Sequence, residues 1–167
     1  FIMRLDLKKF FFGDDVMQNI DYSFKMSETE WDGFKPFVSD VLVKGKIWSF
    51  AGSAMLECTL DYDFSMPCSR CAEETLKHFT LKVNHNLVRE VSDEDNDSYI
   101  VVENESIDLD ELFYSDIVLE IPISYVCKED CKGLCPQCGK NLNKGSCNCK
   151  TNQIDPRLEV LKKLIDN

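Results

Sequence analysis

The spacing of the cysteines constrains this chain more than any other feature. Six of the nine cysteines lie within the 23 residues from Cys127 to Cys149. An odd number of cysteines argues against a disulfide framework when no export signal is recognised. Short, closely spaced segments also suit convergence on a small cation better than independent disulfide loops. The sequence therefore predicts a metal-binding module over residues 127–150. The other three cysteines are Cys58, Cys68 and Cys71.

The strongest candidate site is the stretch CPQCGKNLNKGSCNC. Cys135 and Cys138, with proline and glycine around them, form a tight knuckle in which backbone N–H groups can point at the sulfurs. Cys147 and Cys149 follow after eight residues, so a short hairpin can bring four sulfurs into tetrahedral geometry around Zn²⁺. Because four thiolates leave no open coordination position, we expect a structural zinc ion and no catalytic one.

Cys127 and Cys131 leave the sharing of ligands open, because six sulfurs exceed one tetrahedron. They can replace the Cys147 and Cys149 pair beside the CPQC knuckle. They can instead form a second zinc site with Cys68 and Cys71, which lie in the turn SMPCSRCAEE. A redox dithiol at Cys68 and Cys71 is a third alternative, although that motif normally opens a helix in a βαβ unit.

Alternation with a period of two predicts a sheet. Residues 41–50 are rich in β-branched and aromatic side chains, and residues 55–64 alternate so that Leu56, Cys58 and Leu60 share one face. Cys58 is therefore expected to be a buried core thiol. A second alternating strand covers residues 79–87, and YIVVE is a shorter one. Because the connections are short, we expect an antiparallel sheet or a partly closed β-barrel.

A helix is predicted over residues 109–120. Asp108 can cap it with Glu111 three residues later, and Pro122 ends it. Another helix is predicted after Asp155, with Pro156 at its first position. The expected organisation is an α+β domain over residues 3–126, with its sheet core at about 41–102, then the zinc module at 127–150 and a C-terminal helix at 151–167.

The charge distribution limits the choice of partners. The chain has a net charge of −11, although residues 127–150 carry five lysines against two acids. Residues 90–120 contain twelve acids and neither lysine nor arginine. A general nucleic-acid binder is disfavoured. The acidic stretch is expected to be either a solvated surface that keeps the protein soluble or a docking surface for a basic protein. Direct RNA contact by the lysines is the alternative. The partner-binding candidates are Asp93, Glu94, Asp95 and Asp97.

Evidence for catalysis is thin. The only histidines, His78 and His85, lie on opposite faces of one predicted strand, and no glycine-rich phosphate loop occurs. No apolar run is long enough for a membrane span, and the opening FIMRLDLKKFFFGDD is not a typical secretory signal. We expect a cytoplasmic protein with neither a membrane nor a small-molecule partner. Met3 begins a natural-looking stretch, MRLDLKKF, so the sequence leaves open whether Phe1 and Ile2 are native.

Four features together resemble the bacterial YceD family of large ribosomal RNA subunit accumulation proteins. They are the CSRC turn, the acidic helix ending in EIP, the run CKEDCKGLCPQCGKNLNKGSCNCK and the terminal DPRLEVLKKL. The resemblance extends from about Val41 to the C-terminus. It departs from the family pattern at Ala72, where leucine is usual, which affects packing more than chemistry.

The resemblance implies a non-enzymatic factor for the accumulation of large-subunit ribosomal RNA, acting in ribosome biogenesis. Family members differ in keeping the C-terminal cysteines, which implies that the metal stabilises the protein. The expected partner is a basic ribosomal protein or the assembling large subunit. A metal-binding adaptor unrelated to ribosomes and, with less support, a CxxC oxidoreductase are the alternative functions.

Overall fold

The computed structural model describes residues 3–31, 33–90 and 99–149. The chain divides into two compact units. The first, the sheet unit, comprises Phe1–Met66 and Thr75–Ile123, and the second, the cysteine unit, comprises Pro67–Glu74 and Ser124–Asn167. The predicted C-terminal helix at 151–167 and the four acidic candidates Asp93, Glu94, Asp95 and Asp97 lie outside the described residues.

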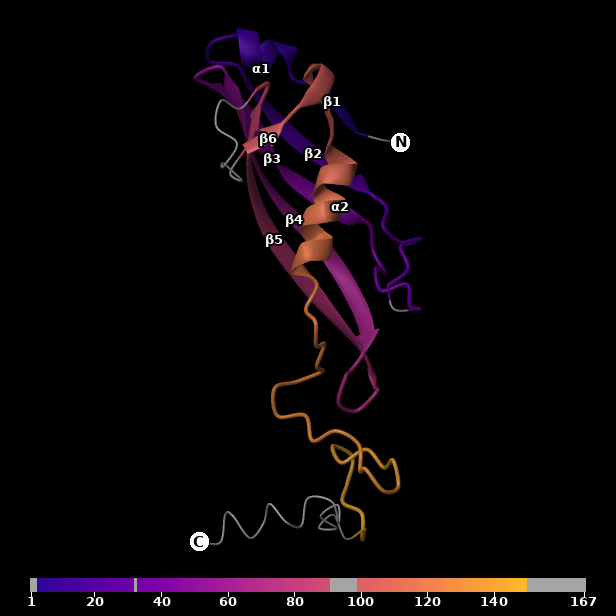
Figure 1. Cartoon of the computed structure of the whole chain (residues 1–167). Coiled ribbons are helices and arrows are strands. Elements are labelled where there is room, and N and C mark those ends of the chain that lie inside the picture. The colour runs from indigo at the N-terminus through magenta and orange to yellow at the C-terminus, as the bar shows by residue number, and fades with distance from the viewer. Residues whose placement is uncertain (1–2, 32, 91–98, 150–167) are drawn as a thin grey trace, which may run out of the picture. The chain divides into compact units, whose positions relative to one another are not determined.

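The sheet unit is built on five neighbouring strands in the order β2-β3-β4-β5-β6 (Figure 1). β2 pairs antiparallel with β3, and β3 pairs antiparallel with β4. β5 and β6 are parallel, with Asn86 opposite Tyr99 and Val88 opposite Val101. The bounds are Met17–Phe24 for β2, Val41–Phe50 for β3, Ser53–Pro67 for β4, Glu74–Val88 for β5 and Tyr99–Val101 for β6.

The observed sheet corrects two expectations. The partly closed β-barrel, one of the two expected forms, is not formed, because β2 and β6 stand at opposite edges of an open sheet. The purely antiparallel pairing is also wrong, because β6 runs in the same direction as β5. A short connection normally signals an antiparallel neighbour. Here the ten residues between Val88 and Tyr99 suffice for a parallel edge strand of only three residues.

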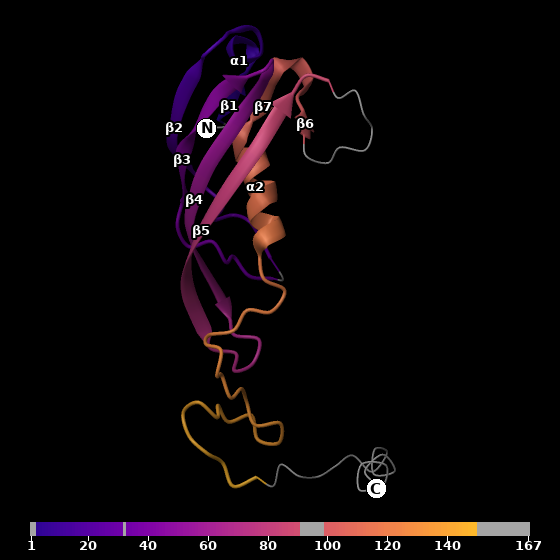
Figure 2. The ribbon, with the colours of Figure 1, turned by 90° about the vertical axis from the view of Figure 1, so that its left-hand side faces the viewer.

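The strand periodicity places the core as predicted. Leu56, Cys58 and Leu60 of β4 are all at most 2% exposed. The helix α2 (Leu109–Glu120) lies across one face of the sheet (Figures 1 and 2) and buries Leu109, Phe113 and Ile117. The expectation of an α+β domain is therefore confirmed in its coarse form, because the unit is mainly β-sheet and a helix covers one face.

The N-terminal region contains more structure than its sequence pattern indicates. β1 (Arg4–Asp6) pairs antiparallel with β7 (Ser106–Asp108) in a separate two-stranded sheet. The short helix α1 (Lys8–Phe12) buries Phe10 and Phe11. A 3-10 turn, η1 (Glu103–Glu105), precedes β7. Since these elements are short and stabilised by distant partners, local periodicity does not reveal them.

Candidate metal centre

Two groups of four cysteines come together within the cysteine unit. We call Cys68, Cys71, Cys127 and Cys131 the turn tetrad, and Cys135, Cys138, Cys147 and Cys149 the terminal tetrad. Within each tetrad, all four sulfur atoms lie within 4.8 Å of one another. The cysteines are free thiols. The described part of the chain thus offers two sets of ligands of the kind that bind tetrahedral metal ions.

The sulfur separations in the turn tetrad match tetrahedral coordination. The Sγ atoms of Cys68 and Cys131 are 3.8 Å apart, and those of Cys71 and Cys127 are also 3.8 Å apart. A zinc–sulfur bond of about 2.3 Å gives the same separation, about 3.8 Å, between the corners of a tetrahedron. A disulfide needs about 2.05 Å, so these sulfurs are spaced as metal ligands and not as oxidised pairs.

Backbone N–H groups favour the charged form of Cys68. The amides of Arg70 and Cys127 donate to its sulfur at 3.4 and 3.3 Å. Burial alone would raise the pKa of this thiol, but the N–H groups of Cys127, Cys71 and Arg70 lower the pKa to about 6. Backbone N–H groups of the CSRC turn and of Cys127 therefore stabilise a thiolate at Cys68, the form in which cysteine binds metal.

The terminal tetrad is built on the predicted CPQC knuckle. Gly139 has a φ of +70° and donates its N–H to the carbonyl oxygen of Cys135 at 2.9 Å. The N–H groups of Cys138 and Gln137, which outweigh burial, lower the pKa of Cys135 to about 6. Glycine suits this turn because the left-handed conformation costs it little. Cys135 is buried and Cys138 is exposed.

Each tetrad also contains a thiol that resists ionisation. Burial and the neighbouring sulfurs raise the pKa of Cys127 to about 12. In the terminal tetrad, the hydrogen bond with Cys138 and then burial raise the pKa of Cys149 to about 12. Four closely spaced thiolates repel one another, so full ionisation needs a cation among them. Both tetrads fit a divalent metal ion that would be held by all four sulfurs.

The structure shows which cysteines lie close together. The predicted set Cys135, Cys138, Cys147 and Cys149 comes together as proposed from spacing. Cys127 and Cys131 join Cys68 and Cys71, the arrangement considered for a second site, and not the CPQC knuckle. Cys58 is in the sheet unit, where burial raises its pKa to about 11.

Sequence reasoning missed Asn143, which contacts the sulfur of Cys131. Its side-chain amide donates to Sγ of Cys131 at 3.3 Å. Burial opposes charge on Cys131, but the Asn143 amide and the Gly133 N–H lower its pKa. The only sequence signal is the NLN triplet after the knuckle, which by itself does not indicate a contact with a sulfur twelve residues earlier.

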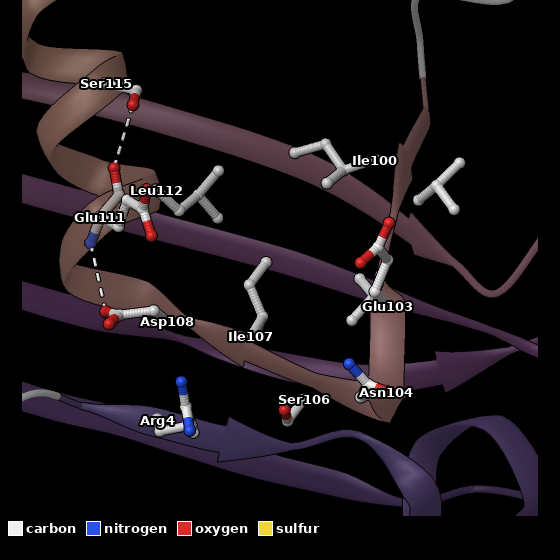
Figure 3. Close-up of a pocket in the computed structure, with 12 residues that line it drawn as sticks. Arg4, Ile100, Glu103, Asn104, Ser106, Ile107, Asp108, Glu111, Leu112 and Ser115 are labelled. Carbon is white, nitrogen blue, oxygen red and sulfur yellow. Dashed lines mark hydrogen bonds between the residues drawn. The ribbon is translucent and has the colours of Figure 1, made fainter.

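The sheet unit contains a separate pocket of about 430 Å³ formed by β1, β6, η1, β7 and the first turns of α2 (Figure 3). Glu103, Asp108 and Glu111 contribute carboxylates, and Arg4 contributes a guanidinium. Asp108 is already engaged, since it accepts hydrogen bonds from the N–H groups of Asp110 and Glu111. The lining contains neither histidine nor cysteine.

No helix within residues 3–31, 33–90 and 99–149 combines the length and apolar character needed to cross a bilayer.

Comparison with known proteins identifies the family. The model of the large ribosomal RNA subunit accumulation protein YceD matches residues 56–165. The Bacillus subtilis protein YlbN is 32% identical over 130 residues, which cover 77% of this chain and 76% of YlbN. An uncharacterized Mycobacterium tuberculosis protein is 40% identical over 76 residues, 46% of this chain and 35% of that protein.

A plant relative carries a functional name. The chloroplastic "large ribosomal RNA subunit accumulation protein YCED homolog 1" of Arabidopsis thaliana is 40% identical over 53 residues, 32% of this chain and 16% of the plant protein. No solved structure gives a significant match. Since the family model spans about two thirds of the sequence and includes all nine cysteines, the chain belongs to the YceD family.

Proposed function

We propose that this protein is a non-enzymatic, cytoplasmic factor for the accumulation of large-subunit ribosomal RNA, and that zinc at both tetrads stabilises its cysteine unit. Membership of the YceD family supports the first part, together with the name of the plant relatives. The convergence of four sulfur atoms in each tetrad is the observation that carries the second part, and the two 3.8 Å separations in the turn tetrad agree with it.

Zinc is the metal that best suits these ligands. Tetrahedral sets of four thiolates select zinc or iron–sulfur chemistry, and a single Zn²⁺ ion needs no further ligand in such a site. When bound, zinc would supply cross-linking and charge balance. The chain's own part is to direct peptide N–H groups at the sulfurs, as it does at Cys68 and Cys135.

Charge supports a protein partner over direct RNA binding. The described part of the cysteine unit, residues 67–74 and 124–149, has five basic and four acidic side chains, a net charge of +1. A zinc ion with four thiolates carries −2, so two such sites bring this part to about −3. Lys144 is also paired with Glu73, and Lys128 with Asp130. A surface of this sign would not attract phosphates.

The acidic stretch is the better candidate for a contact surface. Glu103 and Glu111 are exposed beside the pocket of Figure 3, and no ion pair within the described residues involves either of them. Apolar side chains of Ile100, Ile107 and Leu112 line the same pocket. A hollow lined by both carboxylates and apolar side chains would fit lysine and arginine side chains of a basic ribosomal protein, because both have long aliphatic stems that end in a cation.

Elemental analysis of the purified full-length chain tests the metal assignment. We expect two zinc ions per chain, and one zinc ion in each of the variants Cys71→Ser and Cys138→Ser. Cys58→Ser is the matched control and should keep both. A native chain without zinc, or a Cys138→Ser variant that keeps two, would show that the terminal tetrad is not a zinc site.

Co-sedimentation with assembling large subunits tests the functional assignment. Reversing the charge of Asp93, Glu94, Asp95 and Asp97 to lysine should weaken the association and its salt dependence, because such charges set the encounter rate. Changing Lys128, Lys132, Lys140 and Lys144 to glutamine should have little effect. Binding to naked large-subunit RNA that the lysine changes abolish, and the acidic changes spare, would favour RNA contact instead. If the native chain does not associate with large-subunit precursors, the adaptor alternative would be favoured.

A further inference from the structure

The loop between the two halves of the terminal tetrad also contacts the turn tetrad. This loop, residues 139–146, contains Asn143. The Oδ1 atom of Asn143 accepts the backbone N–H of Lys132 at 2.9 Å, while its Nδ2 donates to Sγ of Cys131 at 3.3 Å. One side chain therefore holds both the ligand sulfur and the peptide that follows it.

The orientation of the Asn143 amide is fixed by its partners. Only the oxygen can accept the N–H of Lys132, so the NH₂ group must face the sulfur. Asn141 supports this arrangement, because its Oδ1 accepts both the backbone N–H and the Nδ2 of Asn143, at 2.9 and 3.0 Å. Asn141 in turn donates to Glu73, two residues after Cys71, at 3.2 Å.

The terminal tetrad fixes both ends of the same loop. Cys138 immediately precedes Gly139, and Cys147 immediately follows Ser146. Between these ends, the loop pairs with the segment that joins the tetrads: Cys135 N–H donates to the carbonyl of Lys140 at 2.8 Å, and Leu142 N–H to that of Gly133 at 2.9 Å. Lys144 pairs with Glu73. A metal ion in the terminal tetrad would therefore hold Asn143 in place against Cys131.

We propose that Asn143 is a positioning residue for the turn tetrad, and that through it the two tetrads bind their metal ions cooperatively. This inference rests on the proposed metal sites. An outer hydrogen bond to a metal ligand typically contributes 10- to 100-fold in metal affinity. Coupling is reciprocal, so an ion in either tetrad must strengthen binding in the other by the same factor.

The variant Asn143→Asp tests the positioning role in the full-length chain. Aspartate keeps an oxygen for the Lys132 N–H but replaces the sulfur donor with a second carboxylate oxygen. Competition with a chromogenic zinc chelator should show at least one zinc ion held 10- to 100-fold more weakly. Asn148→Asp is the matched control, since it makes the same charge change at an exposed position between Cys147 and Cys149, and it should retain native affinities.

Cobalt spectra distinguish the positioning role from a general loss of stability, because a loss of stability alone would not shift the wavelength of the charge-transfer band. At saturating Co²⁺, the sulfur-to-metal charge-transfer band of Asn143→Asp should move to longer wavelength, because the sulfur has lost a hydrogen-bond donor. The band of Asn148→Asp should match the native band. Native affinities together with a native band in Asn143→Asp would overturn the positioning role.

Two double variants, each of which removes two cysteines from one tetrad, test the cooperativity. Cys147→Ser/Cys149→Ser leaves the turn tetrad intact, and Cys71→Ser/Cys127→Ser leaves the terminal tetrad intact. Each remaining site should bind zinc more weakly than in the native chain, by the same factor. Native affinity at both remaining sites would show that the sites are independent. If the native chain holds two zinc ions, such results reject this inference alone, whereas a native chain without zinc rejects the proposed metal sites themselves.

Discussion

At the scale of single residues, Cys58 differs from the other eight cysteines because it is packed in the core of the sheet unit. It is 2% exposed, and it lies opposite Gly45 on the neighbouring strand β3. A Cβ atom at Gly45 would lie 2.1 Å from the carbonyl oxygen of Glu57 and 2.6 Å from the Cys58 sulfur. Glycine is therefore required in the middle of β3 by lack of space. Burial raises the pKa of Cys58 to about 11, which keeps the thiol neutral and unreactive.

Replacing Cys58 by alanine should affect stability but not metal. The change removes one buried sulfur, so we expect the free energy of unfolding to fall by about 1–2 kcal/mol. Zinc content should remain at the native value. Denaturant titration and elemental analysis of the same preparation measure both effects. Loss of zinc from this variant would make Cys58 a ligand and would contradict the division into two tetrads.

At the scale of the elements, several acidic residues of the stretch 90–120 cap α2 or attach it to the sheet. Asp108 caps the helix by accepting the N–H groups of Asp110 and Glu111. Asp110 accepts the hydroxyl of Tyr22 in β2 at 2.9 Å, and Asp116 lies 2.8 Å from Nε2 of His85 in β5. These carboxylates hold the helix on the sheet, so a partner can use only the exposed remainder of the acidic stretch.

Removal of the helix cap should destabilise the sheet unit. Asp108→Ala deprives two N–H groups of their acceptor, and we expect it to cost about 1 kcal/mol of unfolding free energy. Glu103→Ala is the control, because Glu103 is exposed and no hydrogen bond of the described chain involves its side chain. That control should stay within about 0.5 kcal/mol of the native protein. Equal stability of Asp108→Ala and the native protein would contradict the capping role.

The attachment of α2 to β2 should weaken at high pH. Burial, followed by the hydrogen bond to Asp110, raises the pKa of Tyr22 well above the ordinary value of 10.0. A raised folded-state pKa means that the stabilisation is fully present below about pH 10 and is lost as the pH rises further. The free energy of unfolding should therefore fall above pH 10 less steeply in Tyr22→Phe than in the native chain. Identical slopes in parallel denaturant titrations would contradict this role.

At the scale of the whole molecule, the two units have cores of different kinds. The sheet unit buries aromatic and aliphatic side chains such as Phe37, Phe64 and Phe113. A cluster in the cysteine unit consists of Cys68, Cys71 and Cys131, with Val126 and Cys127 packed against it. A cluster of this size buries little apolar surface to offset the conformational entropy of the chain. The proposed zinc ions would therefore supply much of the folding free energy of this unit.

Removal of zinc should therefore unfold one unit and spare the other. With a strong chelator, the cysteine unit should lose its structure, because structural zinc supplies on the order of 10 kcal/mol in zinc-finger peptides. The amide protons of β3 and β4 should remain protected from hydrogen exchange. Exchange measured by mass spectrometry with and without chelator distinguishes the units. Loss of protection throughout β3 and β4 would contradict two separate cores.

Local spacing in the sequence was enough to predict the short-range features. The alternation around Cys58 identified the buried face of β4, Asp108 identified the start of α2, and the CPQCG knuckle with its CNC partner identified the terminal tetrad. Each of these features depends on residues within about fifteen positions of one another. The geometry of a strand, a helix turn or a knuckle is then imposed by the backbone itself.

Only the tertiary structure decided the long-range features. Cys127 and Cys131 take as partners two cysteines that lie 56 and 63 residues away in the sequence. The parallel β6, the pairing of β1 with β7 and the contact of Asn143 with Cys131 likewise depend on the path of the chain. Six sulfurs near one another permit several sets of four. Spacing favoured the terminal tetrad but left the partners of Cys127 and Cys131 open. The choice is made by the fold, which brings the CSRC turn to within hydrogen-bonding distance of Tyr125 and Cys127.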